Sequence, residues 1–104
     1  MQNGEKAVYK LQKPWSLPDG RSLEEVSIDI DKLNSGDMDS LELEYAAIFQ
    51  GANPANGIFL TDSKYQMMII ARINGTVYDN TRSIGARDRL LMLREFMRFL
   101  ALPA

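Results

Sequence analysis

The residue types that most often carry enzyme chemistry are missing from this 104-residue sequence, which contains no cysteine and no histidine. Without cysteine there is no thiolate nucleophile, no disulfide and no cysteine-bound zinc. Without histidine, the commonest general base and the commonest transition-metal ligand are absent, and a Ser-His-Asp triad cannot form. Composition leaves open chemistry that carboxylates perform alone and the binding of hard cations.

The closest group of carboxylates lies near the start of a predicted helix and comprises Asp37, Asp39, Glu42 and Glu44. Such a cluster could bind a hard cation or take part in acid–base catalysis. The helix macrodipole also favours acidic residues at this end, and the spacing does not match a calcium-binding loop. We therefore interpret these residues as helix-capping residues, and we predict no catalytic residue, no metal site and no cofactor.

Basic side chains gather near the end of the chain, where Arg87, Arg89, Arg94 and Arg98 follow one another closely. A basic helix face could contact phosphates or an acidic protein. The totals of 12 basic and 14 acidic residues give a net charge of −2, without the basic excess typical of nucleic-acid-binding proteins. A solvated helix face or a protein contact is therefore favoured over nucleic-acid binding.

Methionine and tryptophan offer a different kind of recognition surface. Methionine adapts to several partners but at helical spacing more often fills a core, so the core interpretation is favoured, with Met92 as the expected exposed exception. Trp15 lies between Pro14 and Pro18, and it could anchor a partner or fold back over the first helix. The sequence favours neither alternative for Trp15.

A single α+β domain over residues 1–104 is expected to position these side chains, with residues 1–6 disordered. Alternating apolar and polar residues on both sides of a Pro-Asp-Gly turn signal predict a β-hairpin over residues 7–30, and Pro14 is expected to end its first strand. The longest apolar run, 67–71, is far too short to cross a membrane, and the N-terminus lacks signal-peptide features.

Three helices are predicted after the hairpin, over residues 36–50, 62–74 and 85–102. For the first, Asp39 and Glu42 fit a capping box, with Ser35 or Asp37 as alternative caps. Its predicted core stripe is Leu41, Tyr45 and Ile48, extended by Met38.

The second helix is expected to be central in the fold, because its apolar residues surround it almost completely. We expect Thr61, Asp62 or Ser63 to cap its start, and Asn74-Gly75 to form its left-handed end. A polar connection over residues 76–84 should follow.

The third helix has an apolar arc that covers about half of its circumference at roughly 100° per residue. Such an arc is wider than one packing neighbour requires, and self-association could cover the surplus. The arc comprises Leu90, Leu93, Phe96, Met97, Phe99 and Leu100.

Several short segments, in their order and spacing, resemble the bacteriophage tail assembly chaperone family, small proteins encoded beside the tape-measure gene of long-tailed phages. No strict motif matches in the centre, around residues 57–60 and 67–68. The segments that carry the resemblance are the opening strand Val8-Tyr9-Lys10-Leu11-Gln12-Lys13-Pro14, the turn Asp19-Gly20, the strand Leu23-Glu24-Glu25-Val26-Ser27-Ile28, the helix entry Ser35-Gly36-Asp37-Met38, and Ile84, Asp88 and Phe96 to Leu100 in the last helix.

The resemblance implies a non-enzymatic chaperone in the cytoplasm of a bacterial host, absent from the mature virion. Such proteins bind the tape-measure protein and help to recruit tail tube protein around it. A broad apolar helix face with adaptable methionines suits the shielding of helical segments. The protein-binding residues that we expect are Leu91, Met92, Phe96 and Phe99, with Arg94 and Arg98 at the rim and Trp15 as a further candidate.

Two other functions remain alternatives. A head–tail connector or tail-completion protein would persist in purified particles, whereas a chaperone would not. A small nucleic-acid-binding regulator would use the arginine face, and its affinity would fall steeply with added salt.

Overall fold

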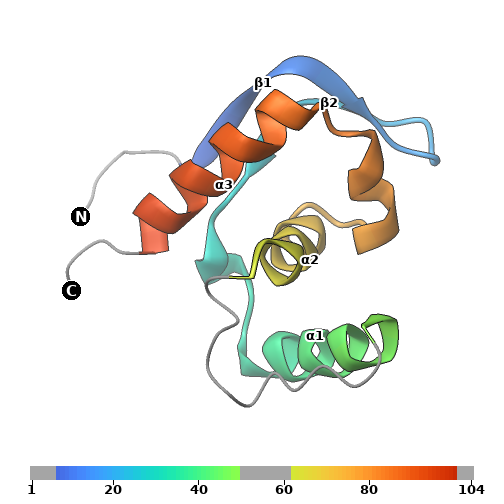
Figure 1. Ribbon diagram of the computed structural model, residues 1–104, viewed down its shortest axis with the longest axis vertical. Coiled ribbons are helices and arrows are strands. Elements are labelled where there is room, and N and C mark those ends of the chain that lie inside the picture. The colour runs from blue at the N-terminus through green and yellow to red at the C-terminus, as the bar shows by residue number, and fades with distance from the viewer. Residues whose placement is uncertain (1–6, 50–61, 101–104) are drawn as a thin grey trace.

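A two-stranded hairpin and three helices make up the computed structural model, which describes residues 7–49 and 62–100 (Figure 1). The predicted α+β class is confirmed. The predictions for residues 1–6, 50 and 101–102 lie outside the described residues. The elements in chain order are β1 (Val8–Ser16), β2 (Ser22–Ser27), the 3-10 turn η1 (Ile30–Lys32), α1 (Ser35–Ile48), α2 (Ser63–Ile73), the 3-10 turn η4 (Tyr78–Ser83) and α3 (Ala86–Leu100).

The hairpin is antiparallel and contains a large irregularity in β1. Tyr9 pairs with Val26 and Lys10 with Glu25, but the next pair joins Trp15 to Leu23. The prediction that Pro14 ends the strand is wrong, because β1 continues to Ser16. Pro14 falls inside the irregular stretch, where a missing N–H group costs no regular ladder bond.

Helix α2 is the centre of the core, as its sequence predicts. Seven consecutive residues, 65–71, are buried, and Figure 1 shows α2 between α1 on one side and the hairpin with α3 on the other. Asp62 caps the helix by accepting hydrogen bonds from the N–H groups of Lys64 and Tyr65. Gly75 ends it with a φ of +75°, a conformation that favours glycine.

The C-terminal end of α2 is tied to the hairpin. The Asn74 amide accepts from the Ser27 N–H at 2.9 Å and donates to the Ser27 carbonyl at 2.9 Å. At the hairpin tip, Arg21 donates to the carbonyl of Gly75 at 3.2 Å. These contacts satisfy backbone groups at the end of the strand and at the end of the helix together.

Helix α1 begins one residue earlier than predicted, with Asn34 as its N-cap. Asn34 and Asp37 form a reciprocal capping box, so the box predicted for Asp39 and Glu42 is wrong. Leu41 and Tyr45 are buried as predicted, whereas Ile48 is 44% exposed. The Tyr45 hydroxyl donates to Asp62, and Arg72 donates to Ser40 at 3.0 Å, so both ends of α2 are fixed to α1.

Candidate protein-binding groove

Helix α3 is attached to β1 through a buried carboxylate at its N-terminal end. Asp88 accepts the Gln12 N–H at 2.9 Å and the Lys13 N–H at 3.1 Å, and the Tyr9 hydroxyl donates to it at 3.2 Å. The two amides belong to the irregular stretch of β1, where they have no regular partner in β2. Asp88 therefore replaces the missing ladder and fixes the position of α3 against the strand.

The ionisation of Asp88 follows from these contacts. Burial alone would raise the pKa of a carboxyl group, but hydrogen bonds from the Gln12 and Lys13 N–H groups and from Tyr9 outweigh it, so the pKa of Asp88 is lowered. Tyr9 responds in the opposite sense, since burial and its hydrogen bond to Asp88 raise the pKa of the phenol. Asp88 is thus a charged acceptor at neutral pH and not a proton donor.

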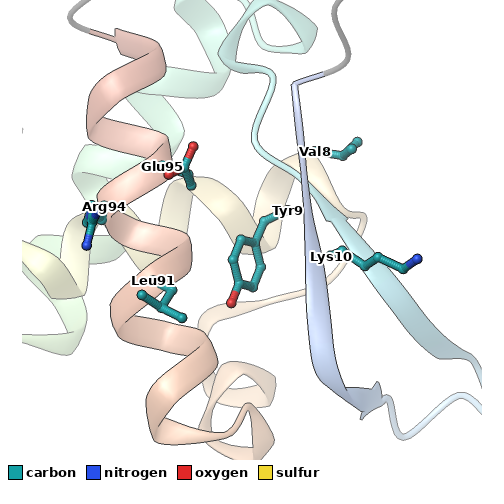
Figure 2. Close-up of a pocket in the computed structure, with 6 residues that line it drawn as sticks. All are labelled: Val8, Tyr9, Lys10, Leu91, Arg94 and Glu95. Atoms are coloured by element: carbon teal, nitrogen blue, oxygen red, sulfur yellow. The ribbon is translucent and has the colours of Figure 1, made fainter.

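Beyond Asp88, a groove of about 390 Å³ runs between β1 and α3 (Figure 2). Figure 2 shows the Tyr9 ring between strand and helix, whereas Val8 and Lys10 project from the other face of β1. The alternation of side chains along a strand explains this arrangement. The helix wall consists of Leu91, Arg94 and Glu95, whose spacing of three and four residues places them on one face.

Charged residues of both signs, Lys10, Arg94 and Glu95, belong to the two walls of the groove. Glu95 lies 3.6 Å from Arg98, which offsets its charge. Lys10 and Arg94 are both exposed, and within residues 7–49 and 62–100 neither of them forms an ion pair. Apolar side chains beside charged groups of both signs can bind a segment of another protein.

The structure separates the predicted binding residues of α3 into two groups. Leu91 lines the groove, Arg94 and Arg98 are exposed, and Phe99 is half-buried against the core. Met92 and Phe96 are completely buried, so their expected exposure is wrong. They lie four and eight residues after Asp88, on the face of α3 that packs inward.

Trp15 is also a core residue. Its exposed fraction is 0%, and its indole N–H donates to the Asn80 carbonyl in η4 at 2.9 Å. A role as an exposed anchor is therefore wrong for the folded chain. The alternative, in which Trp15 folds back onto the body of the protein, agrees with its burial in the same core cluster as Leu41 and Tyr45 of α1.

The sequence alone did not predict the contribution of β1, namely Val8, Tyr9 and Lys10, or the structural role of Asp88. A signal for Asp88 was present, since it shares a helical stripe with the apolar residues Met92 and Phe96. An acidic residue on an apolar stripe is expected to have a buried hydrogen-bond partner. Its partners are 75 and 76 residues away in sequence, which no local pattern identifies.

Among the residues that the structure describes, no group of three or more carboxylates is arranged to hold a metal ion. None of the helices described is both long enough and apolar enough to span a membrane. Comparison of the chain with protein-family models, with characterised proteins and with solved structures found no match.

Proposed function

We propose that this protein is a non-enzymatic tail assembly chaperone, which binds the tape-measure protein of a long-tailed phage in the cytoplasm of the bacterial host. The observation that carries the proposal is the groove between β1 and α3, where apolar side chains and charged groups of both signs lie side by side. Clusters of this kind are typical of surfaces that recognise other proteins. Recruitment of tail tube protein and absence from the mature virion belong to the same proposal.

The order of the elements supports this function. A hairpin with a Pro-containing first strand, a Gly-Asp helix entry and an apolar-Asp-apolar last helix resembles the tail assembly chaperone family. Asp88, which is part of that last segment, holds the helix wall of the groove against the strand. A rigid groove loses little conformational entropy when it binds a partner.

Co-expression with the tape-measure protein encoded in the same genome tests the proposal. We expect the tape-measure protein to become soluble only in the presence of this chain, and the two to co-purify. Leu91→Glu should abolish co-purification, because it places a charge in the apolar centre of the groove. Leu90→Glu is the matched control, since Leu90 is 70% exposed and points roughly 100° away around the helix.

The proposal would be contradicted if both chains fold, the tape-measure protein is equally soluble with and without this chain, and the two do not co-purify. Mass spectrometry of purified particles then separates the remaining functions. A chaperone is absent from them, whereas a head–tail connector or tail-completion protein is present in fixed copy number.

A further inference from the structure

The turn that ends α2 contains an Asn-Gly pair, which is a chemically reactive dipeptide. Asn-Gly occurs at residues 3–4, 56–57 and 74–75 of the sequence, and the last pair lies within the described residues. The backbone nitrogen of a glycine can attack the side-chain amide carbon of the preceding asparagine, because glycine has no Cβ to hinder the approach. Asparagine is accordingly a thermolabile residue in proteins. The fold around Asn74 determines whether this attack can occur.

The backbone of Asn74 holds the Gly75 nitrogen away from the side chain that it would attack. Ring closure requires this nitrogen and Cβ of Asn74 to lie on the same side of the Asn74 Cα–C bond. The ψ angle of Asn74 is 12°, so the Gly75 nitrogen lies beside the backbone nitrogen of Asn74 and away from Cβ. Reacting atoms must be aligned at roughly 3 to 3.5 Å. The ψ angle must therefore rotate before the reaction can begin.

Hydrogen bonds on both reacting groups oppose that rotation. The Asn74 side chain donates to the carbonyls of Ser27 at 2.9 Å and Ile70 at 2.7 Å, and it accepts the Ser27 N–H at 2.9 Å. We call the two hydrogen bonds with Ser27 the α2–β2 joint. The Gly75 N–H, whose proton must leave during the attack, donates to the Arg72 carbonyl at 3.1 Å. Reaction therefore requires the joint and the last turn of α2 to open locally.

We propose that Asn74 is a site of spontaneous deamidation, which reacts only when the α2–β2 joint opens and makes that opening irreversible. The Gly75 nitrogen forms a bond to Cγ of Asn74, and the bond from Cγ to Nδ2 breaks. The side-chain nitrogen leaves as ammonia with the proton that Gly75 loses. Water then opens the resulting succinimide to aspartate or isoaspartate at position 74. This inference does not depend on the proposed chaperone function.

Neither product can rebuild the joint. Aspartate at position 74 can accept the Ser27 N–H, but it has no donor for the carbonyls of Ser27 and Ile70. A carboxylate oxygen would face those two carbonyl oxygens, which costs free energy. Isoaspartate adds a methylene group to the backbone directly before Gly75, whose φ of +75° ends the helix. A chain that has reacted therefore stays open more often than the original chain.

Peptide mapping of the full chain tests the inference. The chain is incubated at mildly alkaline pH, digested, and analysed by tandem mass spectrometry for deamidation at Asn74. A synthetic peptide of residues 71–78, which contains neither β2 nor Ile70, provides the rate without protection. We expect the folded chain to react at least about tenfold more slowly than the peptide, and the chain unfolded in urea to react as fast as the peptide.

Hydrogen exchange supplies a quantitative comparison. Exchange of the Gly75 amide requires the same opening as the attack, so it measures the open fraction of the turn. The deamidation rate of the folded chain should equal the peptide rate multiplied by this fraction. Low urea concentrations, which favour the open state without a substitution, should accelerate both processes in parallel.

Substitutions separate the fold from the chemistry. Arg21 donates to the carbonyls of Asn74 at 3.4 Å and Gly75 at 3.2 Å, so Arg21→Ala should accelerate deamidation severalfold in the folded chain. Arg87→Ala, at an exposed position of α3, is the matched control and should leave the rate unchanged. Gly75→Ala should slow the reaction in the urea-unfolded chain, because the added Cβ hinders the nucleophile.

Three results would overturn the inference. The first is equal deamidation rates in the folded chain and the peptide, and the second is a folded-chain rate that does not follow the exchange of the Gly75 amide. The third is a purified deamidated chain whose free energy of unfolding equals that of the original chain. Slow deamidation that accelerates with Arg21→Ala, together with a destabilised product, would support it.

Discussion

At the residue scale, one buried carboxylate compensates for an irregular strand. Register shifts in β1 leave the Gln12 and Lys13 amides without partners in β2, and Asp88 accepts both. Buried amides without an acceptor would each cost free energy comparable to a lost hydrogen bond. The carboxylate of Asp88 therefore supplies the hydrogen-bond acceptor that the irregular part of β1 requires.

Replacement of Asp88 should destabilise the fold. Asp88→Asn removes the charge and leaves a single acceptor oxygen for two amides, so we expect the free energy of unfolding to fall by about 1.5 to 3 kcal/mol. Urea unfolding followed by circular dichroism measures the change. Asp79→Asn is the control, because Asp79 is exposed and its ion pair with Arg82 at 3.6 Å should contribute less than about 1 kcal/mol. Equal effects of the two substitutions would contradict this role of Asp88.

The same carboxylate predicts a pH dependence of stability. Because the folded chain lowers the pKa of Asp88 below its ordinary value of 3.8, its contribution is fully present above that pH. It is lost as the pH falls through the folded pKa. We expect the free energy of unfolding to decrease from about pH 4 downward, with a smaller slope in Asp88→Asn. The pKa of Asp62 is also lowered, so the free energy of unfolding of Asp88→Asn should still decrease as the pH falls.

At the element scale, the helices could be predicted because their determinants are local. Asp62 before α2 and Gly75 after it are adjacent to the residues they cap, and the apolar run between them predicted a central helix correctly. The cap of α1 was assigned to the wrong residues because several cap-forming side chains follow one another from Asn34 to Asp39. The groove could not be predicted, because it depends on a strand register and on contacts between the first and last elements.

The hydrogen bonds between Asn74 at the end of α2 and Ser27 of β2 can be tested by a substitution. Asn74→Ala removes the amide that pairs with both backbone groups of Ser27, so we expect a loss of about 1 to 3 kcal/mol in the free energy of unfolding. Hydrogen exchange at the Ser27 amide should become much faster. The amides of residues 66–71 should still rank in the same order by their exchange rates. Unchanged protection at Ser27 would show that the joint does not depend on this side chain.

At the scale of the whole molecule, one core joins the hairpin to all three helices. Buried residues from β1, β2, α1, α2 and α3 belong to a single cluster, with α2 at its centre. A domain of this size with one core is expected to unfold in a single cooperative transition. No part of the described chain forms a separate core that could persist alone.

The single tryptophan gives a direct measurement of this cooperativity. Trp15 is fully buried and contacts η4, so its fluorescence should shift to longer wavelength when the core opens. We expect urea transitions followed by fluorescence and by circular dichroism to coincide, because helix and hairpin lose structure together. If the urea midpoint measured by fluorescence lies well below the urea midpoint measured by circular dichroism, the hairpin instead separates before the helices unfold.

The link between Asp88 and β1 also has a consequence for synthesis. Gln12 and its acceptor are 76 residues apart, which a ribosome translates in about 4 to 15 seconds. A hairpin can form within microseconds, so the newly made β1 waits far longer for its carboxylate than it needs to fold. During that interval its outer edge has no cover at Gln12 and Lys13. Translation must therefore reach the last helix before the nascent chain acquires both walls of its groove.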